Sequence, residues 1–171
     1  MTITPTPPTL APMPDRRIVI HEVSHARAAL AVAEALGVPV VLVSAPRAGA
    51  VMGAPWFAAV VEMAAADHPA ARYRAVLDCG DGAGDALAAL GFGIGAVRVT
   101  LPPEVLTRLE DIAKKLGATI EVGEVGEVGE VGEVGNRLDL LDHHDPEAAC
   151  RLYYCGSAAL WLQDSSSAIK A

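Results

Sequence analysis

Five short apolar runs, rich in β-branched residues, recur along the first two thirds of the chain, and each connection between them is long enough to hold a helix. The runs begin at Arg17, Val38, Tyr73, Ala96 and Thr119. Strands joined by connections of this length are expected to lie parallel, because antiparallel neighbours need only a short turn. The pattern predicts an α/β fold with a doubly wound, mostly parallel five-stranded sheet. We expect the three-layer arrangement of Rossmann-like folds, with a flavodoxin-like strand order.

The connections themselves carry helix signals. An alanine-rich segment follows Ser24, the predicted N-cap, and ends at Gly37. A second helix follows Pro55 and covers 56–67, and the predicted helix at 104–116 begins after a Pro-Pro pair. A shorter helix, ending at Leu90, completes the alternation of strands and helices.

The composition divides the chain into four parts. Residues 1–15 are rich in proline and predict a disordered tail, and residues 16–122 form the predicted α/β domain. Residues 121–136 contain five Glu-Val-Gly triplets, whose period of three matches neither a strand nor a helix, so we expect a surface loop. Residues 137–171 predict a linker and a C-terminal helix with a frayed end.

Charge and cysteine content narrow the partners. The net charge is -8, and without the five glutamates of the repeat it is -3. No stripe of Lys and Arg is present, so we expect neither a nucleic acid nor a membrane as partner. No apolar run approaches the ~18 residues of a membrane span. Three cysteines and an N-terminus without a signal-peptide pattern predict a cytoplasmic protein.

Polar residues follow the first three predicted strands, where open α/β sheets bind their ligands. His21 and Asp78 are the candidate catalytic residues, because a histidine exchanges protons near neutral pH and a carboxylate assists it. An arginine at such an edge binds a carboxylate or phosphate, and paired aspartates hold a cation such as Mg²⁺. The candidate ligand-binding residues are Glu22, Ser24, Ser44, Arg47, Cys79 and Asp81. The structural alternative is that these side chains only cap helices and form turns.

The sequence His21-Glu22-Val23-Ser24-His25 matches the H-E-x-x-H motif of zinc hydrolases. In that motif, both histidines lie on one face of a continuous helix and bind zinc. The resemblance covers only these five residues, and the preceding strand places His21 before the helix. Glu62 is the candidate third ligand of this alternative. Magnesium, or no metal at all, is favoured over zinc.

Two further patterns have ordinary structural explanations. Gly80, Gly82 and Gly84 lack the spacing of a dinucleotide fingerprint and predict a tight turn. The thiols of Cys150 and Cys155 lie five residues apart on the predicted terminal helix, so they point in different directions and do not form a zinc knuckle with His143 and His144.

Three functional hypotheses remain. The first is a small α/β domain that binds a small anionic ligand at its strand ends, with or without catalysis. The second is a non-catalytic assembly or interaction protein that uses the repeat and the terminal helix for its contacts. A homo-oligomer is one form that such an assembly can take. The third is a zinc hydrolase.

Overall fold

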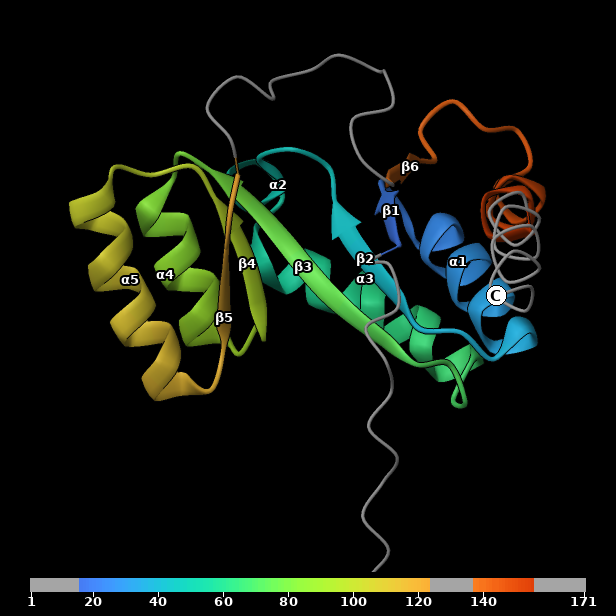
Figure 1. Cartoon of the computed structure of the whole chain (residues 1–171), viewed down its shortest axis with the longest axis horizontal. Helices are drawn as coiled ribbons and strands as arrows, with labels where there is room; N and C mark the ends of the chain where they lie inside the picture. The colour runs from blue at the N-terminus through green and yellow to red at the C-terminus, as the bar shows by residue number, and fades with distance from the viewer. Residues whose placement is uncertain (1–15, 124–136, 156–171) are drawn as a thin grey trace, which may run out of the picture.

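The computed structural model describes residues 16–123 and 137–155. Strands and helices alternate along this part of the chain, as Figure 1 shows. The elements are β1 (Arg17–Ile20), α1 (Val23–Leu36), β2 (Val40–Ser44), α2 (Ala48–Val51), α3 (Gly53–Asp67), β3 (Tyr73–Gly80), α4 (Ala83–Phe92), β4 (Ala96–Val99), α5 (Pro103–Leu116), β5 (Thr119–Val122) and β6 (Arg137–Asp139). Residues 146–155 are also helical.

The α/β class and the parallel sheet are confirmed. The six strands stand in the order β5-β4-β3-β2-β1-β6, and every pairing is parallel. The sixth strand, β6, pairs with β1 over three residues and was not predicted, because so short a segment shows no strand pattern in the sequence. The predicted repeat loop, proline-rich tail and frayed C-terminal end lie mostly or wholly outside the described residues.

The flavodoxin-like strand order is wrong. In that order, the second strand lies at an edge and the chain then reverses, whereas β1 to β5 are neighbours in the order in which they occur in the chain. Only β6 lies on the other side of β1. The number and spacing of strands and helices are the same for both orders, so the alternation pattern did not distinguish between them.

The main core lies between the described helices and one face of the sheet. Right-handed crossovers between successive neighbouring strands place their helices on the same face. The main cluster of buried side chains accordingly combines strand residues such as Ile18, Leu42 and Leu77 with residues from α1, α3, α4 and α5. A second, small cluster contains strand residues alone: Val41, Val43, Val76 and Ala96.

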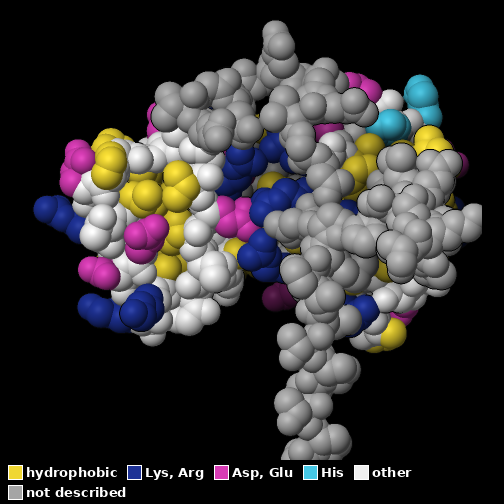
Figure 2. All heavy atoms as spheres, in the orientation of Figure 1, with side chains coloured by type: hydrophobic (Ala, Val, Ile, Leu, Met, Phe, Trp, Pro, Cys, Tyr) yellow, Lys and Arg dark blue, Asp and Glu magenta, His cyan; other side chains and the backbone are white. Residues whose placement is uncertain are grey.

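The face that carries the second cluster is concave. Arg17 of β1 donates to both carboxylate oxygens of Glu121 of β5, at 2.6 and 3.2 Å, and Arg74 of β3 donates to the same carboxylate at 2.6 Å. Four strand spacings separate β1 from β5, which is about 19 Å in a flat sheet. The two side chains cannot bridge that width, so the sheet must curve. Figure 2 shows acidic and basic side chains gathered in the resulting hollow.

The long central strand β3 produces part of this curvature. Its first half, from Tyr73 to Val76, pairs with β2, whereas its second half, from Leu77 to Gly80, pairs with β4. The register shifts between Asp78 and Gly80, and a shift of this kind bends and twists a strand. The carboxyl end of β3 therefore projects beyond its pairing with β2, and Asp78 lies in this projecting part.

The carboxylate of Glu121 is expected to be a major contributor to stability. Its side chain is 16% exposed and those of its partners Arg17 and Arg74 are 21% and 44% exposed. Glu121→Gln removes the carboxylate charge that the guanidinium groups of Arg17 and Arg74 share. We expect a loss of about 2–3 kcal/mol in the free energy of unfolding, measured by chemical denaturation.

Glu147→Gln is the matched control. Glu147 pairs with Arg151 one helical turn away, and both side chains are about half exposed. Its loss is expected to stay below about 0.5 kcal/mol. Equal losses of unfolding free energy in Glu121→Gln and Glu147→Gln would contradict a structural role for the contacts of Glu121 across the concave face.

Candidate ligand site

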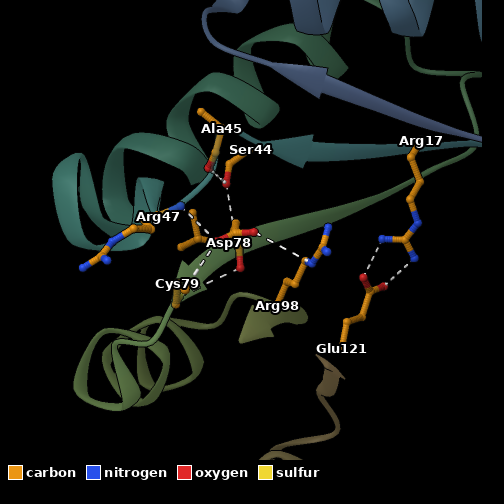
Figure 3. Close-up of polar contacts among 10 residues, drawn as sticks. Arg17, Ser44, Ala45, Arg47, Asp78, Cys79, Arg98 and Glu121 are labelled. Carbon is orange, nitrogen blue, oxygen red and sulfur yellow. Dashed lines mark hydrogen bonds and ion pairs between the residues drawn. The ribbon is translucent and has the colours of Figure 1, made fainter. Parts of the chain in front are cut away.

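The ends of β2 and β3 are joined by a buried serine. Ser44, the last residue of β2, is 2% exposed. Its hydroxyl donates to the carbonyl oxygen of Ala45 at 3.0 Å and accepts the backbone N–H of Asp78 at 2.9 Å. Figure 3 shows these two contacts. Both the donor and an acceptor position of the hydroxyl are therefore used within the fold, and Ser44 positions Asp78 rather than facing a ligand.

The carboxylate of Asp78 organises the loop that follows β2. Its Oδ1 atom accepts the backbone N–H of Arg47 at 2.9 Å and that of Gly80 at 3.0 Å. Its Oδ2 atom lies 3.9 Å from Nε of Arg98, on the neighbouring strand β4. Asp78 thus connects three segments at the carboxyl edge, as Figure 3 shows.

Arg47 and Asp81 lie outside this group of buried contacts. Their side chains form an ion pair at 3.0 Å and are 58% and 68% exposed. An ion pair at this exposure contributes little free energy, because water solvates both charges almost as well. Both side chains can therefore exchange their contact for one with a ligand.

Cys79 faces the main core and is fully buried. Burial raises the pKa of its thiol to about 12, and the negative charges of Asp78 and Asp85 add to this. A β-carbon on Gly49 would lie 2.6 Å from its sulfur, so α2 packs directly on it. The thiol remains protonated at neutral pH and does not line the carboxyl edge, so it serves packing rather than ligand binding.

A second polar group surrounds His21, directly after β1. Its Nε2 atom lies 2.7 Å from Oδ1 of Asp139, the last residue of β6. Its backbone N–H donates to Nδ1 of His25 at 3.3 Å, and the two imidazole rings meet edge to face. The side chain of His21 is thereby fixed between the first turn of α1 and the end of β6.

Glu22 and Ser24 lie at the exposed start of α1. The helix begins at Val23 with Glu22 as its N-cap residue, so the predicted capping role of Ser24 is wrong. Ser24 lies in the first turn, and its hydroxyl donates to the carboxylate of Glu22. The same carboxylate lies 3.7 Å from Nε2 of His25.

The predicted site residues therefore form two groups along one edge. Ser44, Arg47, Asp78 and Asp81 are connected at the ends of β2 and β3. The other group comprises His21, Glu22, Ser24 and His25, joined by Asp139, at the ends of β1 and β6. Within the described part of the chain, no hydrogen bond or ion pair connects the two groups. The two groups follow the ends of β1 and β2, which are neighbours in the sheet.

The zinc alternative does not assemble in the described residues. His21 precedes the first residue of α1, so the two histidines of the motif do not share one helical face. Glu62 lies exposed on α3. Of the terminal pair, Cys150 is buried and Cys155 is exposed. Over 16–123 and 137–155, no group of three or more His, Cys, Asp or Glu side chains is arranged to hold a metal ion.

Three charged residues near these groups were missed by sequence reasoning. Asp139 was missed because β6 was not predicted. Arg98 and Glu121 each interrupt a β-branched run with a single charge, and Arg17 and Arg74 are charged positions of two other strands. Charges within several predicted strands indicate polar contacts on one face of the sheet, and that signal was available.

Stability should fall as the pH drops below about 6.5 through the protonation of His25. Burial lowers the pKa of His25, and His21 and His143 lower it further, although Glu22 and Asp139 partly oppose them. The unfolded chain therefore binds the proton more readily than the folded one. The stabilising contribution is complete above the unfolded value of about 6.5 and decreases as the pH falls toward the lowered folded value.

His25→Gln keeps an acceptor for the backbone N–H of His21 but does not titrate. Denaturation midpoints measured between pH 5 and 7.5 should show a shallower slope in this variant than in the wild type. His68→Gln, which removes a histidine paired with Glu34 elsewhere, is the control. Parallel pH profiles for wild type and His25→Gln would contradict the assignment.

No helix in the described ranges is long and apolar enough to cross a membrane. No protein-family model matches the chain, and no curated protein matches it. The site is therefore interpreted from its own geometry.

Proposed function

We propose that the chain binds a small anionic ligand at the carboxyl edge of its sheet and that His21 exchanges a proton with this ligand. The contact between His21 and Asp139 is the main support. It joins the ends of β1 and β6, which are the two strands between which the strand order reverses. Open α/β sheets commonly bind ligands outside the carboxyl ends of their strands at such a reversal.

The geometry supports proton transfer by the Nδ1 atom of His21. Because Asp139 lies at Nε2, that nitrogen carries the proton and donates to the carboxylate. The lone pair of the neutral ring is then on Nδ1. No hydrogen bond to Nδ1 is formed within the described ranges. Asp139 also stabilises the imidazolium that forms when Nδ1 accepts a proton, as the carboxylate does in acid–base dyads.

The charge of the neighbouring groups favours an anionic ligand. The exposed guanidinium of Arg47 lies at the end of β2, next to β1, and its pair with Asp81 is exchangeable. Arginine binds carboxylate and phosphate with two parallel hydrogen bonds. A ligand that contacts both Arg47 and His21 would place its anionic group at one and its proton-exchanging group at the other.

The test uses His21→Gln, Asp139→Asn and inorganic phosphate as the probe. Calorimetric titrations in two buffers of different ionisation enthalpy measure both the affinity and the number of protons taken up. We expect wild-type protein to take up protons on binding, and both variants to lose this uptake and to bind roughly tenfold more weakly.

His68→Gln is the matched control because His68 also pairs with a carboxylate, Glu34, at 3.0 Å and with similar exposure. This pair lies where α1 and α3 end, at the opposite edge of the sheet. It should behave like the wild type. Equal proton uptake in the wild type, His21→Gln and His68→Gln would refute the role of His21. Native mass spectrometry of protein purified under mild conditions would identify the natural ligand.

A further inference from the structure

Arg47 has a backbone conformation that arginine rarely adopts. Its φ of 58° and ψ of 19° lie in the left-handed region, and it is the one non-glycine residue with positive φ in the described ranges. A side chain with a β-carbon is disfavoured there, whereas glycine is not. Glycines occupy the other positive-φ positions of the same ranges. The presence of arginine at this position therefore needs an explanation beyond the turn itself.

The surrounding structure holds this conformation in place. Oδ1 of Asp78 accepts the backbone N–H of Arg47 and also that of Gly80. The aliphatic part of Arg47 lies over Gly80, where a β-carbon would be only 2.7 Å from Cγ of Arg47. Asp78 is itself fixed by Ser44. Two residues on β3 thus determine the direction in which the arginine leaves the sheet.

The contacts of the Arg47 guanidinium within the fold are too weak to explain why arginine occupies this position. Its ion-pair partner, Asp81, is more exposed than Arg47 itself, and the side chain extends away from Asp78 in Figure 3. Backbone conformations of this kind persist where the surrounding structure enforces them, and they cluster at active sites and ligand-binding positions. An arginine whose backbone is held in place loses less freedom when it binds a ligand than one on a flexible loop.

We propose that Arg47 recognises the oxyanion of the ligand, a carboxylate or a phosphate, and that Asp78 is a positioning residue that holds it ready. The proposal rests on the proposed function, because that function places the ligand at this edge. It adds the positioning role of Asp78 and a reason why the fold maintains a strained residue at this edge. Asp81 is the internal carboxylate that the ligand oxyanion replaces on the guanidinium.

Arg47→Gly and Arg47→Ala separate strain from binding, since both lack the guanidinium but only alanine keeps a β-carbon. Phosphate and malonate are the probes, titrated against chloride at equal ionic strength. Both variants should bind the effective probe at least about tenfold more weakly than the wild type. The denaturation midpoint of Arg47→Gly should exceed that of Arg47→Ala. Unchanged binding in both variants would overturn the recognition role, and equal midpoints would overturn the strain.

Two further variants test the neighbours of Arg47. Asp81→Asn removes the competing carboxylate and should tighten oxyanion binding, whereas weaker binding would contradict the exchange. Asp78→Ala should weaken binding as much as Arg47→Gly, and Asp78→Asn, which keeps an oxygen acceptor at Oδ1, should restore it. A folded Asp78→Ala protein that binds like the wild type would overturn the positioning role.

The outcomes for Arg47 and His21 are distinguishable. If Arg47 binds the oxyanion but His21 has no role, the Arg47 variants lose affinity while His21→Gln retains both affinity and proton uptake. If His21 acts but Arg47 does not, His21→Gln loses affinity and proton uptake while the Arg47 variants bind like the wild type. If neither set of variants changes phosphate or malonate binding, both proposals fail.

Discussion

The carboxylate of Glu121 on the edge strand β5 reaches across the concave face of the sheet to side chains of β1 and β3. It accepts hydrogen bonds from Arg17 on β1 and Arg74 on β3, across the concave face. Removing charges from water is costly, and the shared carboxylate offsets part of that cost for both guanidinium groups. On the other face, apolar side chains of the helices pack against those of the strands. Apolar burial therefore acts on both faces, and the concave face adds charged contacts between strands.

The bend of β3 determines which residues meet at the carboxyl edge. The second half of β3 extends beyond its pairing with β2, which carries Asp78 to the level of the loop after β2. From this position its carboxylate can hold the backbone of Arg47. On the other side of β1, the short strand β6 brings Asp139 to His21. Two carboxylates therefore hold two residues at this edge. Asp78 holds Arg47 through its backbone N–H, and Asp139 holds His21 through the ring nitrogen Nε2.

Much of the fold was predictable from local sequence. The β-branched runs and the segments between them predicted the strands β1 to β5 and the helices α1, α3, α4 and α5, because burial and propensity act within each segment. The short helix α2 was expected to be a loop, because Gly49 and Gly53 favour one. The strand order was not predictable, since it depends on which faces are buried. The charged contacts among Arg17, Arg74 and Glu121 join separate strands, so no single segment of the sequence shows them.

The candidate site was predicted only in part, for the same reason. His21, Arg47 and Asp78 were selected because they follow strands, and the structure places each at the carboxyl edge. Cys79 was also selected, although its side chain alternates to the core face. Asp139 could not be selected, because a three-residue strand after a long repeat has no signature of its own. The left-handed conformation of Arg47 depends on Asp78 and Gly80, which are far from it in sequence.

The chemistry of a pair does not by itself mark a site, and two histidines show this. His68 contacts Glu34, and His21 contacts Asp139, with comparable distances and exposure. His68 lies at the C-terminal end of α3 and connects the ends of two helices, so its contact serves the packing of α1 and α3. His21 lies where the strand order reverses, and a strained arginine lies at the end of the next strand. Two features therefore mark the His21–Asp139 pair, and not the His68–Glu34 pair, as a candidate functional pair. It lies at the reversal of the strand order, and its neighbour Arg47 has a disfavoured backbone conformation.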